Sequence, residues 1–154
     1  MTLEDFNWMG KALDHETQID LLKKEIDIIS KSNYDKVRDF HTAFNMKVAD
    51  EPNLETHDAA LRIKLITEEY NEVVEAIENG NLVDIAKELS DLLYVVYGTA
   101  VSFGIDIDTV FDEVHRSNMS KLGADGRPVY RDDGKVLKGE NYVPADVEKL
   151  VLKK

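Results

Sequence analysis

The stretch that decides the fold runs from residue 68 to residue 91 and reads EEYNEVVEAIENGNLVDIAKELSD. Its centre, Asn79-Gly80-Asn81, contains residue types that tolerate the left-handed backbone conformation on which helices commonly end. If both flanks are helices, the stretch is an antiparallel hairpin, and residues equidistant from Gly80 lie side by side. With a rise of 1.5 Å per residue, the acidic positions on both flanks lie roughly 12–17 Å from the turn.

Five carboxylates are mirrored about this turn. They are Glu68, Glu69 and Glu72 before it, and Glu88 and Asp91 after it. The hairpin predicts that Glu72 faces Glu88 and that Glu69 faces Asp91, because acids three or four positions apart share one helix face. Such a concentration of negative charge is costly unless cations compensate it. Oxygen-only ligands favour Mg²⁺ or Mn²⁺ over zinc or copper, so the pattern predicts a site for hard divalent cations.

A solvated helix face is the competing interpretation, since 31 acidic residues among 154 will often produce such runs. Two features favour the metal site. Glu88 and Asp91 lie amid apolar residues, and Lys87 is expected to point elsewhere, which leaves Asp91 without a neutralising side chain. Di-iron bundles use Glu-x-x-His on paired helices, and the absence of His here argues against iron.

The bulk composition limits the classes of function. With 154 residues, 43% hydrophobic and 32% charged, the chain is expected to form one soluble globular domain. A net charge of −12 disfavours nucleic-acid polymers and anionic membranes as partners. The chain has no Cys, which excludes thiol chemistry. Its N-terminus does not resemble a signal peptide, and its longest apolar stretch, 92–103, is too short to span a bilayer, so we expect a cytoplasmic protein.

The spacing of apolar residues predicts an all-α fold, a helical bundle that contains the antiparallel pair. Helices are expected over about 14–30, 34–47, 82–103 and 146–152. Two more are expected, one from a cap at Thr56 or Asp58 to residue 78 and one from a cap at Asp106 or Asp108 to residue 121. The turn-rich segment between residues 121 and 146 is expected to be a short hairpin or an ordered loop. The second half of 82–103 is apolar on nearly every face, which predicts either a central core position or an oligomer interface.

The motif Glu68-Glu69-x-x-Glu72, a helical spacer and Glu88-x-x-Asp91 resembles that of the all-α nucleoside triphosphate pyrophosphohydrolases, the MazG-like family. This family includes phosphoribosyl-ATP pyrophosphohydrolases and dimeric all-α dUTPases. The likeness extends over roughly 34–146, through segments 39–44, 91–98, 114–121 and 133–138. It implies a catalytic bundle in 34–121 and a phosphate-side loop in 122–146 of a single domain, 1–154. Residues 1–30 match nothing in the family, and we expect them to form an extra N-terminal helix that packs on the core or completes an oligomer.

The resemblance implies a magnesium-dependent hydrolase that cleaves a (deoxy)nucleoside triphosphate between its α- and β-phosphates. The products are the monophosphate and pyrophosphate, and dUTP or a non-standard nucleotide is an expected substrate. The implied ligands of Mg²⁺, or of Mn²⁺ in its place, are Glu69, Glu72, Glu88 and Asp91. Glu68 is the implied general base, although the sequence leaves open whether Glu68 or Glu69 has that role. A homodimer or a dimer of dimers is expected.

Several residues are expected to bind the substrate. Asn118 and Lys121 lie three positions apart at a helix end, so both can reach one phosphate, although a simple helix end would look the same. Arg131 and Lys138 could close over the phosphates from the turn-rich segment, or be solvated. Tyr94 follows Asp91 on the same face and could flank the sugar or base. His41 is either a base-side residue or a core histidine.

Two other functions stay open at this stage. The first is hydrolysis of phosphoribosyl-ATP in histidine synthesis. The second, from another class, is a non-catalytic helical module that binds divalent metal or a partner protein; it predicts that Glu68 is replaceable and that no phosphate is released.

Overall fold

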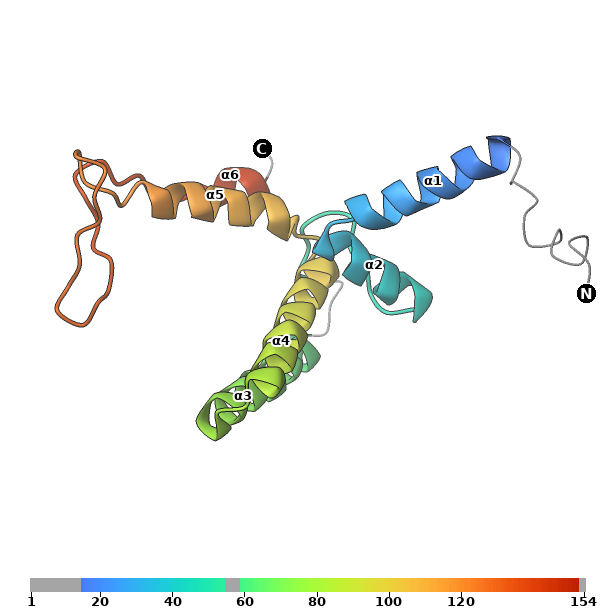
Figure 1. Ribbon diagram of the computed structural model, residues 1–154, viewed down its shortest axis with the longest axis horizontal. Coiled ribbons are helices and arrows are strands. Elements are labelled where there is room, and N and C mark those ends of the chain that lie inside the picture. Colours follow the sequence, from blue (N-terminus) through green and yellow to red (C-terminus); the bar gives the residue numbers. More distant parts are fainter. Residues whose placement is uncertain (1–14, 55–58, 153–154) are drawn as a thin grey trace, which may run out of the picture. The chain divides into compact units, whose positions relative to one another are not determined.

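The computed structural model describes residues 15–54 and 59–152 (Figure 1). This part of the chain contains six α-helices, and its β-type pairing is limited to one isolated antiparallel bridge between Tyr130 and Val136. The predicted all-α class is therefore confirmed. The chain divides into two compact units, Met1–Ser32 and Asn33–Lys154, which we describe separately.

The first unit contributes one described helix, α1 (His15–Ser30). Its bounds agree with the helix expected over 14–30. The rest of the predicted extra N-terminal segment, residues 1–14, lies outside the described residues, as do the expected caps Thr56 and Asp58.

The second unit is built on the hairpin of α3 (Ala59–Asn79) and α4 (Leu82–Phe103), which pack along each other (Figure 1). Gly80 adopts the predicted left-handed conformation, with a φ of 68°. Asn81 caps α4, and its side-chain oxygen accepts a hydrogen bond of 3.0 Å from the backbone N–H of Val83. An Asn at the N-cap satisfies donors that the first helical turn leaves unpaired. The turn therefore fixes which residues of the two helices face each other.

Helix α2 (Asn33–Ala43) packs against α4, but it ends earlier than the predicted residue 47. Asn45 has a φ of 53°, in the left-handed region, and this reverses the chain. The backbone N–H of Met46 then donates to the carbonyl of His41 over 2.8 Å, which closes the end of the helix. The apolar pattern continues past residue 43, so periodicity alone placed the end too late.

The end of α4 is tied to the segment that follows α2. The backbone N–H of Ala49 donates to the carbonyl of Val101 over 3.0 Å, and that of Asn53 donates to Phe103 over 3.1 Å. Gly104 caps the helix with a φ of 69°, and a Cβ placed on it would lie 2.2 Å from the carbonyl oxygen of Glu51. Only glycine fits this crossing.

The core beside α4 is made of small side chains. Its buried apolar members are Val37, Ala49, Val73, Ala76, Ala100 and Val101. The part of α4 before Gly98 instead keeps large apolar side chains on the surface of the chain, among them Leu89, Leu93 and Val96. Of the two expectations for this helix, burial in the core therefore holds only for its C-terminal end within one chain.

Helix α5 (Ile107–Met119) begins at Asp106, the first of the two predicted caps, whose side chain accepts a hydrogen bond from the backbone N–H of Thr109. Helix α6 (Val147–Val151) packs against α5. Between them, the turn-rich segment forms a narrow loop in which the backbone N–H of Arg131 donates to the carbonyl of Lys135 over 2.8 Å. In the described part of the chain, no single helix is long and apolar enough to cross a membrane, and α4 with α5 passes that test only as a pair bent by 113°.

We expect Gly104→Ala to lower the free energy of unfolding by about 2 kcal/mol or more, because it adds a steric clash with Glu51 to the cost of a left-handed residue. The measurement is urea unfolding followed by circular dichroism. Gly126→Ala is the matched control, because Gly126 has a φ of 74° and open space around its Cβ position. Equal losses in the two variants would show that the crossing at Glu51 contributes nothing.

Candidate metal and nucleotide site

Three carboxylates converge across the helix hairpin. Glu69 comes from α3, and Glu88 and Asp91 come from α4. One oxygen of each lies within 4.8 Å of the other two, and all three residues are partly buried. Glu69 and Asp91 thus face each other as the mirrored spacing predicts.

Glu72 lies beside this group. Its carboxyl group lies close to that of Glu88, and the interaction between the two raises the pKa of Glu72 above its usual value. The negative charges of Glu69 and Glu88 raise it further. Glu72 and Glu88 are therefore neighbours across the hairpin, as the mirrored spacing predicts, and the cluster is short of positive charge.

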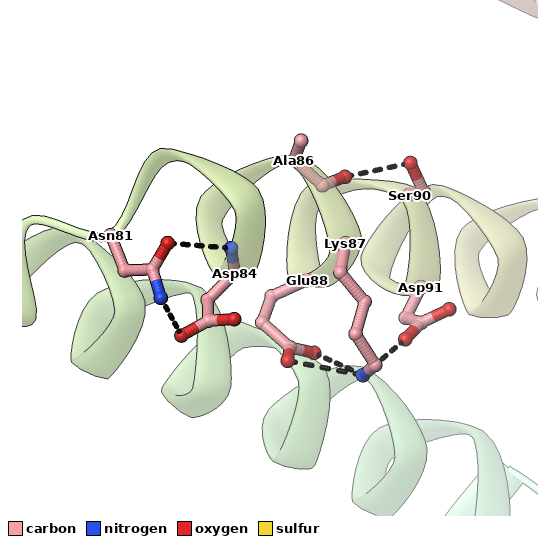
Figure 2. Close-up of polar contacts among 7 residues, drawn as sticks. All are labelled: Asn81, Asp84, Ala86, Lys87, Glu88, Ser90 and Asp91. Carbon is pink, nitrogen blue, oxygen red and sulfur yellow. Dashed lines mark hydrogen bonds and ion pairs between the residues drawn. The ribbon is translucent and has the colours of Figure 1, made fainter.

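Lys87 partly supplies that charge, which corrects the prediction that it points elsewhere. Its ammonium group lies 3.0 and 3.1 Å from the two oxygens of Glu88 and 2.9 Å from an oxygen of Asp91 (Figure 2). The hydrogen bond to Asp91, and then that to Glu88, raises the pKa of Lys87 above its usual value. Asp91 follows Lys87 by four positions, so the two share a helix face. Spacing alone could have revealed this contact.

The donor set fits a hard divalent cation. All of its ligating atoms are carboxylate oxygens, which Mg²⁺ and Mn²⁺ prefer. The Lys87 ammonium group forms ion pairs with both Glu88 and Asp91, so a positive charge is stabilised between these two acids. Glu69, Glu72, Glu88 and Asp91 are therefore the residues that could hold a metal ion. Glu68 is exposed on α3 and lies outside the converging group of three.

The structure also brings together Asn118 and Lys121 at the end of α5. The Lys121 ammonium group donates to the side-chain oxygen of Asn118 over 2.6 Å. The two side chains are therefore close enough to contact the same phosphate group, as their spacing predicts. Their role in substrate binding stays a prediction.

Arg131 and Lys138 have separate surroundings in the loop. Arg131 forms a double hydrogen bond with Asp133, one arm of which measures 2.9 Å. Lys138 places its ammonium group 4.3 Å from the ring centroid of Tyr142, a contact that sequence reasoning missed. Arg131 is thus neutralised by its neighbour, whereas Lys138 keeps its charge next to a neutral ring.

Tyr94 belongs to an aromatic cluster between α2 and α4. Its ring meets that of Phe40 edge-on with centroids 5.6 Å apart, and Phe40 lies 4.3 Å from Phe44. All three side chains keep a third or more of their surface exposed. The cluster offers flat apolar surface to a ligand, and the predicted role of Tyr94 beside the sugar or base stays a prediction.

His41 is a core residue, with 2% of its surface exposed. Its Nδ1 lies 2.8 Å from the carbonyl oxygen of Lys47. A Cβ placed on Gly98 would lie 3.0 Å from its Nε2 and 3.2 Å from the guanidinium of Arg62, which is also buried. These contacts describe a packing role that joins α2 to α4, and the predicted role of His41 in substrate binding stays a prediction.

Comparison with known proteins identifies the family. The phosphoribosyl-ATP pyrophosphohydrolase family, PRA-PH, matches residues 37–118, more than half of the chain. The chain belongs to this family. The match spans α2 to α5 and includes all of the clustered carboxylates, so the resemblance to the all-α, MazG-like nucleotide pyrophosphohydrolases is confirmed.

Two known proteins are similar to this chain, one in sequence and one in structure. An uncharacterized protein of Acanthamoeba polyphaga mimivirus is 35% identical over 131 residues, which cover 78% of this chain and 48% of the viral one. The chain thus spans about half the length of this curated relative. A crystal structure of a candidate NTP pyrophosphohydrolase from Exiguobacterium sp. 255-15 has a TM-score of 0.41 and 24% identity, over 80% of this chain and 95% of that one.

We expect Mg²⁺ or Mn²⁺ to raise the melting temperature of this family member through the clustered carboxylates. An ion present at a hundred times its Kd stabilises the folded state by about 2.7 kcal/mol. Glu69→Gln should remove most of this gain, measured by thermal unfolding across a metal titration. Glu78→Gln, an exposed acid of the same helix outside the cluster, is the control. A similar gain in both variants would place ion binding elsewhere.

We expect His41 to make the protein less stable in mild acid. Burial, and the charge of Arg62, lower the pKa of His41 below 6.5 in the folded state. As pH falls below 6.5, the unfolded chain therefore takes up the proton first, and the contribution of neutral His41 to stability is lost. Urea midpoints between pH 5 and 7 measure this. His41→Gln should show a shallower pH dependence, and an unchanged slope would contradict the argument.

Proposed function

We propose that the protein is a magnesium-dependent nucleotide pyrophosphohydrolase. In this proposal it cleaves a (deoxy)nucleoside triphosphate between the α- and β-phosphates, releasing the monophosphate and pyrophosphate. The observation that carries the proposal is the convergence of Glu69, Glu88 and Asp91, with Glu72 beside them, in a chain of this family. Substrates such as dUTP or non-standard nucleotides follow from the same family resemblance.

The proposed chemistry depends on charge and position. Hydrolysis of a phosphoanhydride requires neutralisation of the phosphate oxygens and an oriented water. When bound, Mg²⁺ supplies positive charge to those oxygens. Glu68 is the proposed base that takes the proton from the attacking water, since its carboxylate is exposed on α3 next to the ligand Glu69. Its exposure leaves it accessible to a water.

The remaining site residues have proposed roles in binding. Asn118 and Lys121, which share a hydrogen bond, would hold one phosphate group. Lys138, and Arg131 after release from Asp133, would add positive charge from the loop. Tyr94 would flank the sugar or base, with the rings of Phe40 and Phe44 beside it.

We also propose that the protein works as a homodimer or a dimer of dimers. The observation that favours this state is the apolar surface of the helix hairpin. Its large exposed side chains include Ile63, Tyr70, Ile77, Leu82, Val83, Leu89 and Leu93. Monomeric soluble proteins seldom expose so many neighbouring apolar groups, and a second copy would cover them.

Phosphoribosyl-ATP is the second candidate substrate, because the matching family carries that name. It requires the same bond to be cleaved, so the carboxylate cluster serves both candidates. A non-catalytic metal-binding or interaction module is the alternative from another class, and it predicts a folded protein that binds Mg²⁺ and releases no pyrophosphate.

We expect pyrophosphate release in the presence of Mg²⁺ from at least one member of a substrate panel. The panel contains the standard ribo- and deoxynucleoside triphosphates, dUTP and phosphoribosyl-ATP. Glu68→Gln should reduce kcat by about 10²- to 10⁴-fold, the usual contribution of a positioned base. Glu78→Gln should retain the wild-type rate.

The panel separates the proposals. A ranking led by phosphoribosyl-ATP would replace the triphosphate substrate with the second candidate. Release that survives Glu68→Gln would transfer the role of base to another group, first of all Glu69. If no substrate of the panel releases pyrophosphate while Mg²⁺ still raises the melting temperature, the result would favour the non-catalytic metal-binding module.

A further inference from the structure

After the loop, the chain returns along the C-terminal half of α5 and is held there by hydrogen bonds. The backbone N–H of Val143 donates to the Ser120 hydroxyl oxygen over 2.8 Å. That of Asp146 donates to Glu113 over 2.8 Å. The Glu113 carboxylate also accepts two bonds of 2.7 Å from Arg116, and these contacts hold its pKa at about 2. The returning segment therefore has a defined position on α5.

A close crossing begins this return. The backbone N–H of Gly139 donates to the carbonyl of Lys121 over 2.9 Å. A Cβ on Gly139 would lie 2.7 Å from the carbonyl oxygens of both Lys121 and Leu122, closer than real contacts allow. The crossing therefore requires glycine, and it brings Lys138, the preceding residue, next to Lys121.

Tyr142 connects the two lysines. Its ring lies under the Lys138 ammonium group, 4.3 Å away, and its phenol is hydrogen-bonded to the buried Ser117. This hydrogen bond lowers the pKa of Tyr142, and the positive charges of Lys138 and Lys121 lower it as well. The positive charges of both lysines thus act on one phenol, and its contact with Ser117 joins the ring to α5.

Within residues 33–54 and 59–152, neither lysine forms an ion pair with a carboxylate, unlike four other cations of this unit. In the described residues, Arg38, Lys87, Arg116 and Arg131 each form an ion pair with an acid. Lys121 instead contacts the neutral amide of Asn118, and Lys138 contacts a neutral ring. In a chain of net charge −12, two unneutralised ammonium groups in one place favour an anionic ligand.

We propose that Tyr142 is a positioning residue that holds Lys138 beside Lys121, so that the two ammonium groups bind one phosphate group. A lysine side chain is otherwise a flexible point charge, and much of its binding energy is lost in ordering it. The ring restricts Lys138 before the ligand arrives. That this phosphate belongs to a nucleotide rests on the proposed function.

The test measures binding of inorganic tripolyphosphate by calorimetry, with Mg²⁺ present, alongside KM and kcat for the best substrate of the panel. Tyr142→Leu should weaken tripolyphosphate binding and raise KM by about three- to tenfold, the range expected from loss of a cation–ring contact and its ordering. The value of kcat should stay within about twofold, because the residue acts on binding. Tyr142→Phe keeps the ring and should fall between Tyr142→Leu and wild type.

A double-mutant cycle distinguishes positioning from general support of the fold. If Tyr142 acts through Lys138, adding Tyr142→Leu to Lys138→Gln should cause little further loss, because the effects of coupled residues are not additive. Additive losses, or an unchanged Kd in Tyr142→Leu, would overturn the proposal. Tyr130→Leu is the control from the same loop, since Tyr130 is 59% exposed, and it should bind tripolyphosphate like wild type.

The two proposals fail in different ways. A wild-type protein that hydrolyses nucleotides while Tyr142→Leu keeps its KM would sustain the function and overturn the role of Tyr142. A wild-type protein that hydrolyses nothing, yet binds tripolyphosphate in a manner that depends on Tyr142, would overturn the function and sustain the anion-binding position.

Discussion

Repulsion among acidic side chains on the facing sides of α3 and α4 is the interaction to which the rest of the structure responds. The Gly80-Asn81 turn fixes the register of the hairpin, and that register places Glu69 and Glu72 opposite Glu88 and Asp91. Three responses are visible. The pKa of Glu72 is raised beside Glu88, the Lys87 ammonium group binds two of the acids, and the clustered acids stay partly exposed.

The register of this hairpin could be predicted because every determinant is local. The turn residues, the Asn81 cap and the helical periodicity lie within a short stretch, and each is a property of sequence neighbours. The same holds for the pair of Asn118 and Lys121, which depends on spacing along one helix end. Residue spacing therefore predicted which acids meet, and the family match later supported the resemblance that the motif suggested.

Other features depend on contacts between segments far apart in sequence, and spacing could not give them. The burial of His41 depends on the absence of a side chain at Gly98. The ring of Tyr142 meets Lys138 because Gly139 allows the chain to pass close to Lys121 and Leu122, just after α5. The early end of α2, at Ala43, reflects the left-handed backbone of Asn45 and the hydrogen bond from Met46 to His41 rather than the apolar pattern. The prediction that Lys87 points away from the acids was wrong for a different reason. Its spacing of four residues from Asp91 already indicates the contact that the structure shows.

The crossing at Gly139 has a consequence for how this part of the chain can change. Because the backbone of Gly139 is bonded to Lys121, the residues between them form a closed Ω-shaped excursion whose two ends meet. Insertions or deletions at the exposed turn around Gly126 then leave the position of Lys138 intact. That turn is free to diverge in length and composition, while the base of the loop is held to a single geometry.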